Sequence, residues 1–193
     1  MDERENKNPK LRLIRGGAGS KLAIGGVQIF VGPEKMSPYP VDAVVEEEDT
    51  FLVLSADPEF VEPKENLIRV MTEAIESQPA QPGSVIVLDS YPYRFLAVIH
   101  DLNQEPSWKE EWVATALDEV FREAEERKIQ SIALPLLGTL HGSFEKRRFI
   151  TLLHQTLGRK SPSHLRRIWI VTPEGTASET LEILKADFTK SSR

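Results

Sequence analysis

The protein contains no cysteine among its 193 residues. This absence excludes disulfide frameworks, cysteine-ligated zinc, iron–sulfur clusters and thiol nucleophiles, so several classes of catalytic chemistry are removed at once. The chain also lacks any run of about 18 apolar residues, and its N-terminus, MDERENKNPK, is charged with no apolar segment behind it. We therefore expect neither a membrane span nor a signal peptide, and we expect a cytoplasmic protein.

Length and composition favour one domain. With 193 residues and 40% hydrophobic content, the chain can bury one substantial core but is short for two domains of typical size. We expect a single domain over residues 10–190. A disordered tail at residues 1–9 would precede it, and a short tail at residues 191–193 would follow.

The net charge is −6, yet the charges are unevenly distributed along the chain. Residues 145–167 carry seven basic side chains and one acidic side chain, so this segment is +6 and the remainder is −12. Such asymmetry suits an anionic ligand or a charged protein partner better than nucleic acid, whose binding domains are usually basic overall. A basic face that contacts only solvent is the alternative explanation.

Apolar periodicity predicts alternating strands and helices. Short apolar runs predict β-strands at residues 11–15, 27–31, 41–45, 84–88, 95–99, 132–137 and 167–172. Apolar residues at helical spacing predict helices that begin near Pro63, Trp108, Glu145 and Thr176, and Gly158 is the predicted C-cap of the third. Strands followed by alternating helices and strands predict an α/β fold with a mixed sheet.

The segment between the strand at 132–137 and the helix from Glu145 has the features of a phosphate-binding loop. Glycine lets backbone N–H groups approach an anion closely, and the N-terminus of the following helix adds a positive dipole. Ser143 is the predicted N-cap of that helix. The candidate ligand-binding residues are Gly138, Thr139, Leu140, His141, Gly142, Ser143 and Phe144. An ordinary strand-to-helix turn is the alternative.

Four segments of the chain resemble the macro domain, the ADP-ribose-binding fold of Appr-1″-p processing proteins. They are Val27–Gly32, Val41–Val45, Phe95–His100 and Ser131–Gly142, and the resemblance in element order extends from about residue 22 to residue 188. The resemblance implies a three-layer α/β/α sandwich with a mixed, mostly parallel central sheet. It also implies that Gly138–Phe144 is the loop that surrounds the diphosphate and distal ribose of the ligand.

Three positions depart from the family pattern. Pro33 stands where the family generally carries the aspartate that binds adenine, and Glu46–Asp49 replace the Asn-Ala-Asn stretch that orients the distal ribose and, in hydrolytic members, the catalytic water. The usual glycine-rich first loop is also replaced, because Phe51–Phe60 contains no glycine. The residues that could line the remaining cleft are Glu46, Glu47, Glu48, Asp49, Ser55 and Asp57. A solvated turn is the alternative for Glu46–Asp49.

The ionisable residues leave the chemistry open. His141 could donate a hydrogen bond to a phosphate or exchange a proton near neutral pH. We interpret His100 as a residue that packs at the end of a strand. We assign no metal ligand, although Mg²⁺ could bridge the Glu46–Asp49 carboxylates and a bound phosphate. Binding of ADP-ribose or a related nucleotide diphosphate is the first hypothesis, a scaffold domain without a nucleotide site is the second, and hydrolysis ranks last.

Overall fold

The computed structural model describes residues 22–54 and 79–191. Several predicted features lie outside these ranges: the tail at 1–9, most of the tail at 191–193, the strand at 11–15, the candidate cleft residues Ser55 and Asp57, and the helix from Pro63. Among the described helices, none combines the length and the apolar character that crossing a bilayer requires.

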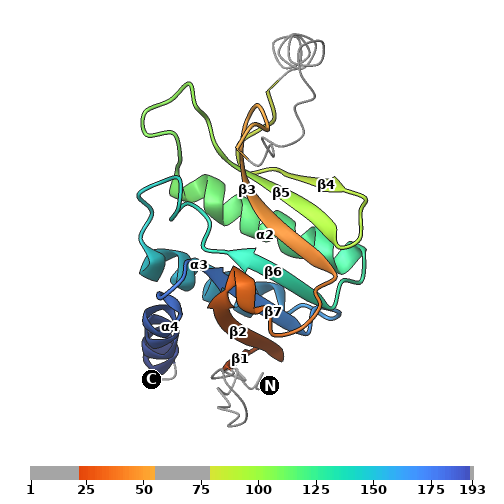
Figure 1. The fold of residues 1–193 in the computed structure, drawn as a ribbon, viewed down its shortest axis with the longest axis vertical. Helices are drawn as coiled ribbons and strands as arrows, with labels where there is room; N and C mark the ends of the chain where they lie inside the picture. Colours follow the sequence, from red (N-terminus) through yellow and green to blue (C-terminus); the bar gives the residue numbers. More distant parts are fainter. Residues whose placement is uncertain (1–21, 55–78, 192–193) are drawn as a thin grey trace, which may run out of the picture.

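The described residues form a seven-stranded mixed sheet with the order β1-β2-β7-β6-β3-β5-β4 (Figure 1). The five central strands run parallel, and an antiparallel strand lies at each edge. The strands are β1 (Leu22–Ile24), β2 (Val27–Pro33), β3 (Ala43–Asp49), β4 (Val85–Leu88), β5 (Tyr93–His100), β6 (Ser131–Pro135) and β7 (Arg167–Thr172). The predicted mixed, mostly parallel sheet is confirmed.

Strand order creates a switch point between β3 and β6. After β3 the chain continues to β4 and β5, which lie toward one edge of the sheet. After β6 it continues to β7, which lies toward the opposite edge. In open α/β sheets, ligands bind outside the carboxyl ends of the strands at such a reversal. Strands β3 and β6 pair only at Ala43 and Val44, and beyond these residues they diverge (Figure 1).

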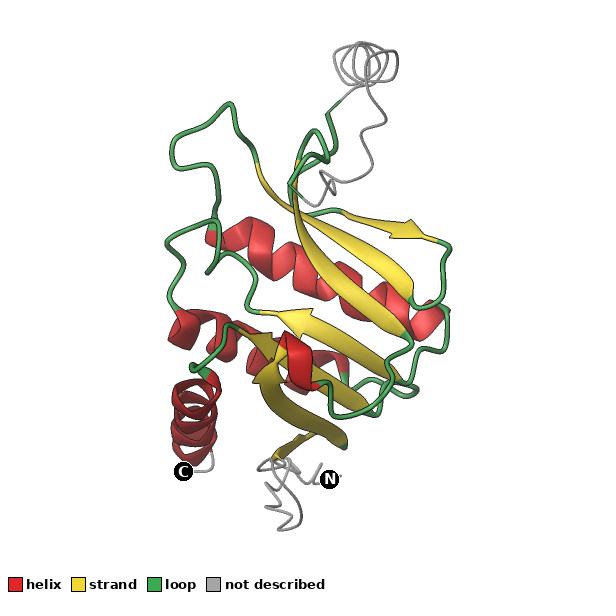
Figure 2. Cartoon of the chain, in the orientation of Figure 1, coloured by secondary structure: helices red, strands yellow, loops and turns green. Residues whose placement is uncertain are grey.

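Three long helices cover one face of the sheet. Helices α2 and α3 contact each other, as do α3 and α4, and all three contribute to one core (Figure 2). Alternate strand residues fill that core, as period-two alternation requires; Ile29, Ile168, Ile132 and Ala43 are neighbours across four strands. The helices are η1 (Glu34–Met36), α2 (Glu110–Glu126), α3 (Lys146–Lys160) and α4 (Ala177–Ser191).

Helices α2 and α3 have boundaries that differ from those predicted. Helix α2 begins at Glu110, because Trp108 instead forms an isolated antiparallel bridge with His100. Helix α3 continues past Gly158 to Lys160 and is capped by Ser161 in the left-handed conformation (φ +44°). The prediction of Gly158 as the C-cap is therefore wrong. A glycine is tolerated inside this helix because its position is exposed.

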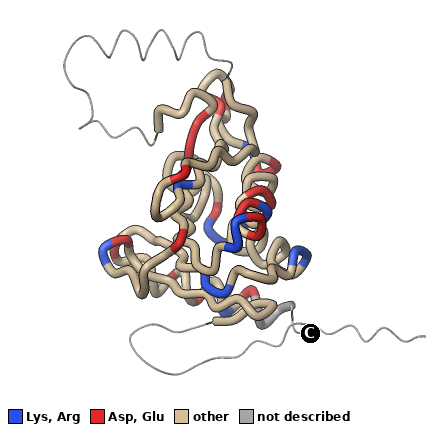
Figure 3. Tube along the Cα trace, turned by 90° about the vertical axis from the view of Figure 1, so that its right-hand side faces the viewer, with Lys and Arg blue, Asp and Glu red and all other residues tan. Residues whose placement is uncertain are grey.

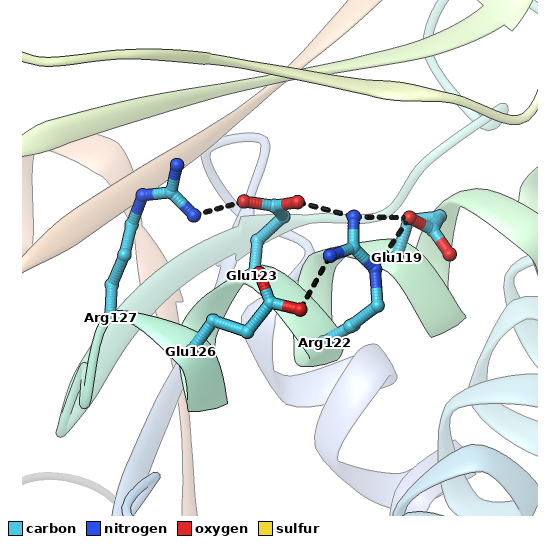
Figure 4. A network of polar contacts seen from close by, with 5 residues as sticks. All are labelled: Glu119, Arg122, Glu123, Glu126 and Arg127. Atoms are coloured by element: carbon cyan, nitrogen blue, oxygen red, sulfur yellow. Dashed lines mark hydrogen bonds and ion pairs between the residues drawn. The ribbon is translucent and has the colours of Figure 1, made fainter.

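Acidic side chains on α2 are held by arginines of the same helix. Arg122 donates to Glu119, Glu123 and Glu126, and Arg127 donates to Glu123 from the residue after the helix (Figure 4). Three of these four pairs join residues three or four apart, which lie on the same helical face, so they follow directly from the sequence spacing. Arg122 and Glu123 are adjacent in sequence, and their pairing does not follow from that rule. The acidic stretch of α2 is therefore locally compensated.

Glu125, on the same helix, anchors the loop before β7. Its carboxylate accepts the backbone amides of Ser163, His164 and Leu165 at distances of 2.9 to 3.1 Å. Burial acts to raise the pKa of Glu125, but these amides and the His164 ring hold the pKa below its ordinary value. The ionised form therefore stabilises the fold.

We expect Glu125→Gln to lower the free energy of unfolding, because a neutral amide oxygen binds the three N–H groups more weakly. Because the pKa of Glu125 is lower in the folded state, its contribution to stability is fully present above the pKa of the unfolded state, which is about 4.3. The contribution is lost as the pH falls through the pKa of the folded state. The deficit of the variant should thus be full at pH 7 and shrink below about pH 4. Urea unfolding between pH 3 and pH 7 measures the loss of unfolding free energy. Glu174→Gln is the control, because Glu174 belongs to an exposed ion pair with Lys35. An equal deficit at pH 7 and pH 3 would contradict the expectation.

Candidate functional site

The acidic tetrad Glu46–Asp49 forms the second half of β3 and is not a turn. Its backbone pairs with β5 from Glu46 to Asp49, with an irregularity after Glu48. Glu48 and Asp49 are both 0% exposed. The prediction of a solvated turn is therefore wrong, and the reason is that each carboxylate has donors within the fold.

Glu46 lies on the side of β3 that faces Arg94 of β5. Its two oxygens accept from the Arg94 guanidinium, at 2.8 Å to Nε and 2.5 Å to Nη2. The bidentate bond raises the pKa of Arg94. Glu46 is therefore a partner of the neighbouring strand.

Glu48 and Asp49 accept backbone amides of the segment that follows β3. Asp49 accepts from Phe51 at 2.6 Å, from Leu54 at 3.1 Å and from Val53 at 3.2 Å. Glu48 accepts from the amides of Asp49 and Leu54, each at 3.2 Å. Protein carboxylates thus occupy the position that an anionic ligand would take relative to these amides.

Glu47 joins the ends of three strands. Its Oε1 lies 2.6 Å from His100 Nε2 at the end of β5, and its Oε2 accepts the Gly138 amide, just past β6, at 2.8 Å. The Glu47 and His100 side chains are 7% and 1% exposed. The bond to Gly138 therefore crosses the gap between β3 and β6 inside the protein, and the bond to His100 joins β3 to β5. His100, predicted as a packing residue, also has this polar role.

The loop 138–144 is closed by two contacts at its base. Gly138 has φ +78°, and its carbonyl accepts the Phe144 amide at 3.1 Å. A Cβ atom on Gly142 would lie 2.6 Å from the Gly138 carbonyl oxygen and 2.7 Å from Trp108 Cδ1. The Trp108 ring also packs on Phe144, with ring centroids 5.2 Å apart. The two predicted glycines thus serve different purposes, one conformational and one steric.

The outer part of the loop offers free backbone donors. The four consecutive amides of residues 140–143 donate to no acceptor among the described residues. Leu140 is 71% exposed, and His141 and Ser143 are also exposed. Ser143 is not the N-cap of α3, because the helix begins one residue later than predicted and Glu145 holds that position.

Most basic side chains beside the loop are already paired. Lys146 binds Glu179 at 2.8 Å and Arg148 binds Glu110 at 2.6 Å. Arg147, between them, pairs with no acidic residue of the described ranges. Figure 3 shows acidic and basic positions interleaved along the chain. Two of the three basic side chains at the start of α3 are therefore engaged in ion pairs, and Arg147 has no acidic partner among the described residues.

Comparisons with known proteins identify the fold. A family model described as the macro domain matches residues 62–153, and no curated protein matches the chain. The Oceanobacillus iheyensis macrodomain with ADP aligns at a TM-score of 0.64 and 14% identity, over 90% of this chain and 96% of that chain. This chain has the macrodomain fold.

Two further solved structures agree with this identification. A mutant of the O. iheyensis macrodomain, with ADPR, aligns at a TM-score of 0.63 and 14% identity, over 90% of this chain and 98% of that chain. The macrodomain of Thermus aquaticus DarG aligns at a TM-score of 0.55 and 21% identity, over 75% of this chain and 98% of that chain. The predicted resemblance to a divergent macro domain is confirmed.

Within the macrodomain fold, the described residues contain no group of three or more histidine, aspartate and glutamate side chains that could hold a metal ion. The carboxylates predicted as possible Mg²⁺ ligands instead accept hydrogen bonds from Arg94, His100 and backbone amides. A cation at this edge would have to compete with those donors.

Substitution Gly142→Ala tests the packing of the macrodomain loop. Its Cβ would overlap the Gly138 carbonyl and the Trp108 ring, so we expect the free energy of unfolding to fall by about 1–3 kcal/mol. Gly158→Ala in α3 is the matched control. It meets nothing within 4 Å and should stabilise the helix by about 1 kcal/mol. Urea unfolding compares the two, and a harmless Gly142→Ala would contradict the close approach of Trp108.

Proposed function

We propose that this macrodomain binds ADP-ribose or a related nucleotide diphosphate, with the loop Gly138–Phe144 on its phosphate side. The observation that carries the proposal is the set of four amides at residues 140–143 for which the described part of the chain provides no acceptor. They lie at the carboxyl edge of the sheet, beside the switch point between β3 and β6. Successive backbone N–H groups before a helix N-terminus are suited to an anion.

Relatives of the same fold support the choice of ligand. Solved forms of the O. iheyensis macrodomain hold ADP and ADPR. A nucleotide diphosphate would place negative charge near the free amides and near the unpaired Arg147, which could add a charge-assisted hydrogen bond. We therefore expect recognition of the phosphate side to resemble that of the relatives.

Recognition of the base must differ from the family pattern. Pro33 ends β2 and has no side-chain acceptor for an adenine amino group. The donors after β3 are also engaged, since Asp49 accepts the amides of Phe51, Val53 and Leu54. The site thus relies on fewer contacts than the resemblance implied, and we expect modest affinity.

A protein-interaction domain without nucleotide binding is the second candidate. It is favoured by the same engaged amides, since side-chain carboxylates fill the anion positions beside β3. Exposed apolar residues at the carboxyl edge, Leu52, Val53 and Leu140, could contact a protein partner. Hydrolysis remains the weakest proposal, because Glu46–Asp49 are bound to groups of the protein itself.

A thermal-shift titration with ADP-ribose, ADP and NAD tests the function. A ligand at about 100 times its dissociation constant should stabilise the fold by roughly 2.7 kcal/mol. The titration is run with and without Mg²⁺. A shift selective for ADP-ribose would support the proposal, and a shift that requires Mg²⁺ would indicate a cation between the protein carboxylates and the ligand phosphates. No shift with any nucleotide would refute nucleotide binding and favour the interaction domain.

The variant Leu140→Asp locates the ligand on the loop. A carboxylate among the free amides should repel a phosphate by about 1 kcal/mol, a roughly fivefold loss of affinity by calorimetry. Because Leu140 is 71% exposed, the fold should be unaffected. Tyr91→Asp, which is 81% exposed between β4 and β5, should leave affinity unchanged. If Leu140→Asp bound the nucleotide as tightly as Tyr91→Asp does, the ligand would lie away from the loop.

A further inference from the structure

Glu47 is the described side chain that bridges the widening gap between β3 and β6. The two strands share ladder pairs only at Ala43 and Val44. Three residues further along, the Glu47 carboxylate restores a connection by accepting the amide of Gly138. It does so at the residue where β6 has ended and the loop turns with positive φ.

The carboxylate is itself held on its other side. His100 Nε2 lies 2.6 Å from Glu47 Oε1, and His100 Nδ1 lies 3.4 Å from the Ser107 hydroxyl. The His100 backbone is fixed as well, because its carbonyl accepts the Thr50 amide at 2.9 Å and it bridges to Trp108. Glu47 thus connects the loop to a rigid part of the sheet.

We propose that Glu47, oriented by His100, is a positioning residue that sets the geometry of the loop 138–144 and through it the affinity for the anionic ligand. The inference rests on the proposed function of this loop. Glu47 is 7% exposed and its two oxygens are engaged, so it acts without touching the ligand. Nothing in the resemblance to macro domains assigns this position such a role.

Positioning and simple electrostatics give opposite expectations for Glu47. If the carboxylate acted mainly by repelling a phosphate, removing its charge would strengthen binding. If it positions the loop, hydrogen bonding matters and charge does not. Glutamine separates the two, because its amide oxygen can accept from Gly138 while its NH₂ donates to His100 Nε2. For this the neutral ring carries its proton on Nδ1, which faces the Ser107 hydroxyl.

The experiment compares variants of the full chain by amide NMR without ligand and by calorimetry with ADP-ribose as probe. Glu47→Gln keeps both hydrogen bonds, Glu47→Ala removes both, and Glu47→Asp keeps the charge on a shorter side chain. Glu46→Ala is the matched control, since this neighbouring carboxylate pairs with Arg94 and not with the loop. Glu47→Asp still carries the test if Glu47→Ala does not fold.

We expect Glu47→Ala and Glu47→Asp to shift the amide signals of residues 138–144, to speed hydrogen exchange at Gly138, and to weaken ADP-ribose binding about tenfold. Glu47→Gln and Glu46→Ala should stay within about twofold of wild type. Unmoved loop signals in Glu47→Ala, or tighter binding by both Glu47→Ala and Glu47→Gln, would overturn the inference. A wild-type protein that binds no ADP-ribose refutes the proposed function, whereas shifted loop signals in Glu47→Ala would still support Glu47 as the residue that positions the loop.

Discussion

The separation of β3 from β6 is the constraint on which the rest of the site depends. Two parallel strands that part leave backbone groups and space at the carboxyl edge, and those groups must find partners because burial of unpaired polar groups is costly. In this chain the partners are carboxylates of β3. One of them, Glu47, spans the gap, and Glu48 and Asp49 bind the segment that follows the strand.

The region beside β3 and the loop after β6 therefore differ in the source of negative charge that their amides can bind. Beside β3 the negative charge belongs to the protein, since Asp49 gathers three backbone amides. Beyond β6 the amides of residues 140–143 donate to no acceptor within residues 22–54 and 79–191. A consecutive acidic run is thus compatible with a neighbouring anion site, because the carboxylates are already bound and buried.

Much of the fold could be predicted from local patterns, whereas the central contacts could not. Apolar runs correctly indicated β4, β5 and β7, and the two glycines correctly marked a structured loop after β6. The solvated-turn alternative for the tetrad was wrong, because four successive acids normally favour solvent, whereas the donors that hold these four are Arg94, His100 and backbone amides that composition does not reveal. The contact between Glu47 and Gly138 joins residues 91 positions apart, so it follows only from the strand order.

The contact between Gly142 and Trp108 links two segments that are distant in sequence. The indole occupies the space where any larger residue at position 142 would place its side chain. The Gly138 carbonyl oxygen lies 2.6 Å from the same Cβ position, so a smaller residue at position 108 would not by itself make room for a side chain. Among related chains with this loop, glycine should therefore persist at position 142 even where the residue at position 108 varies.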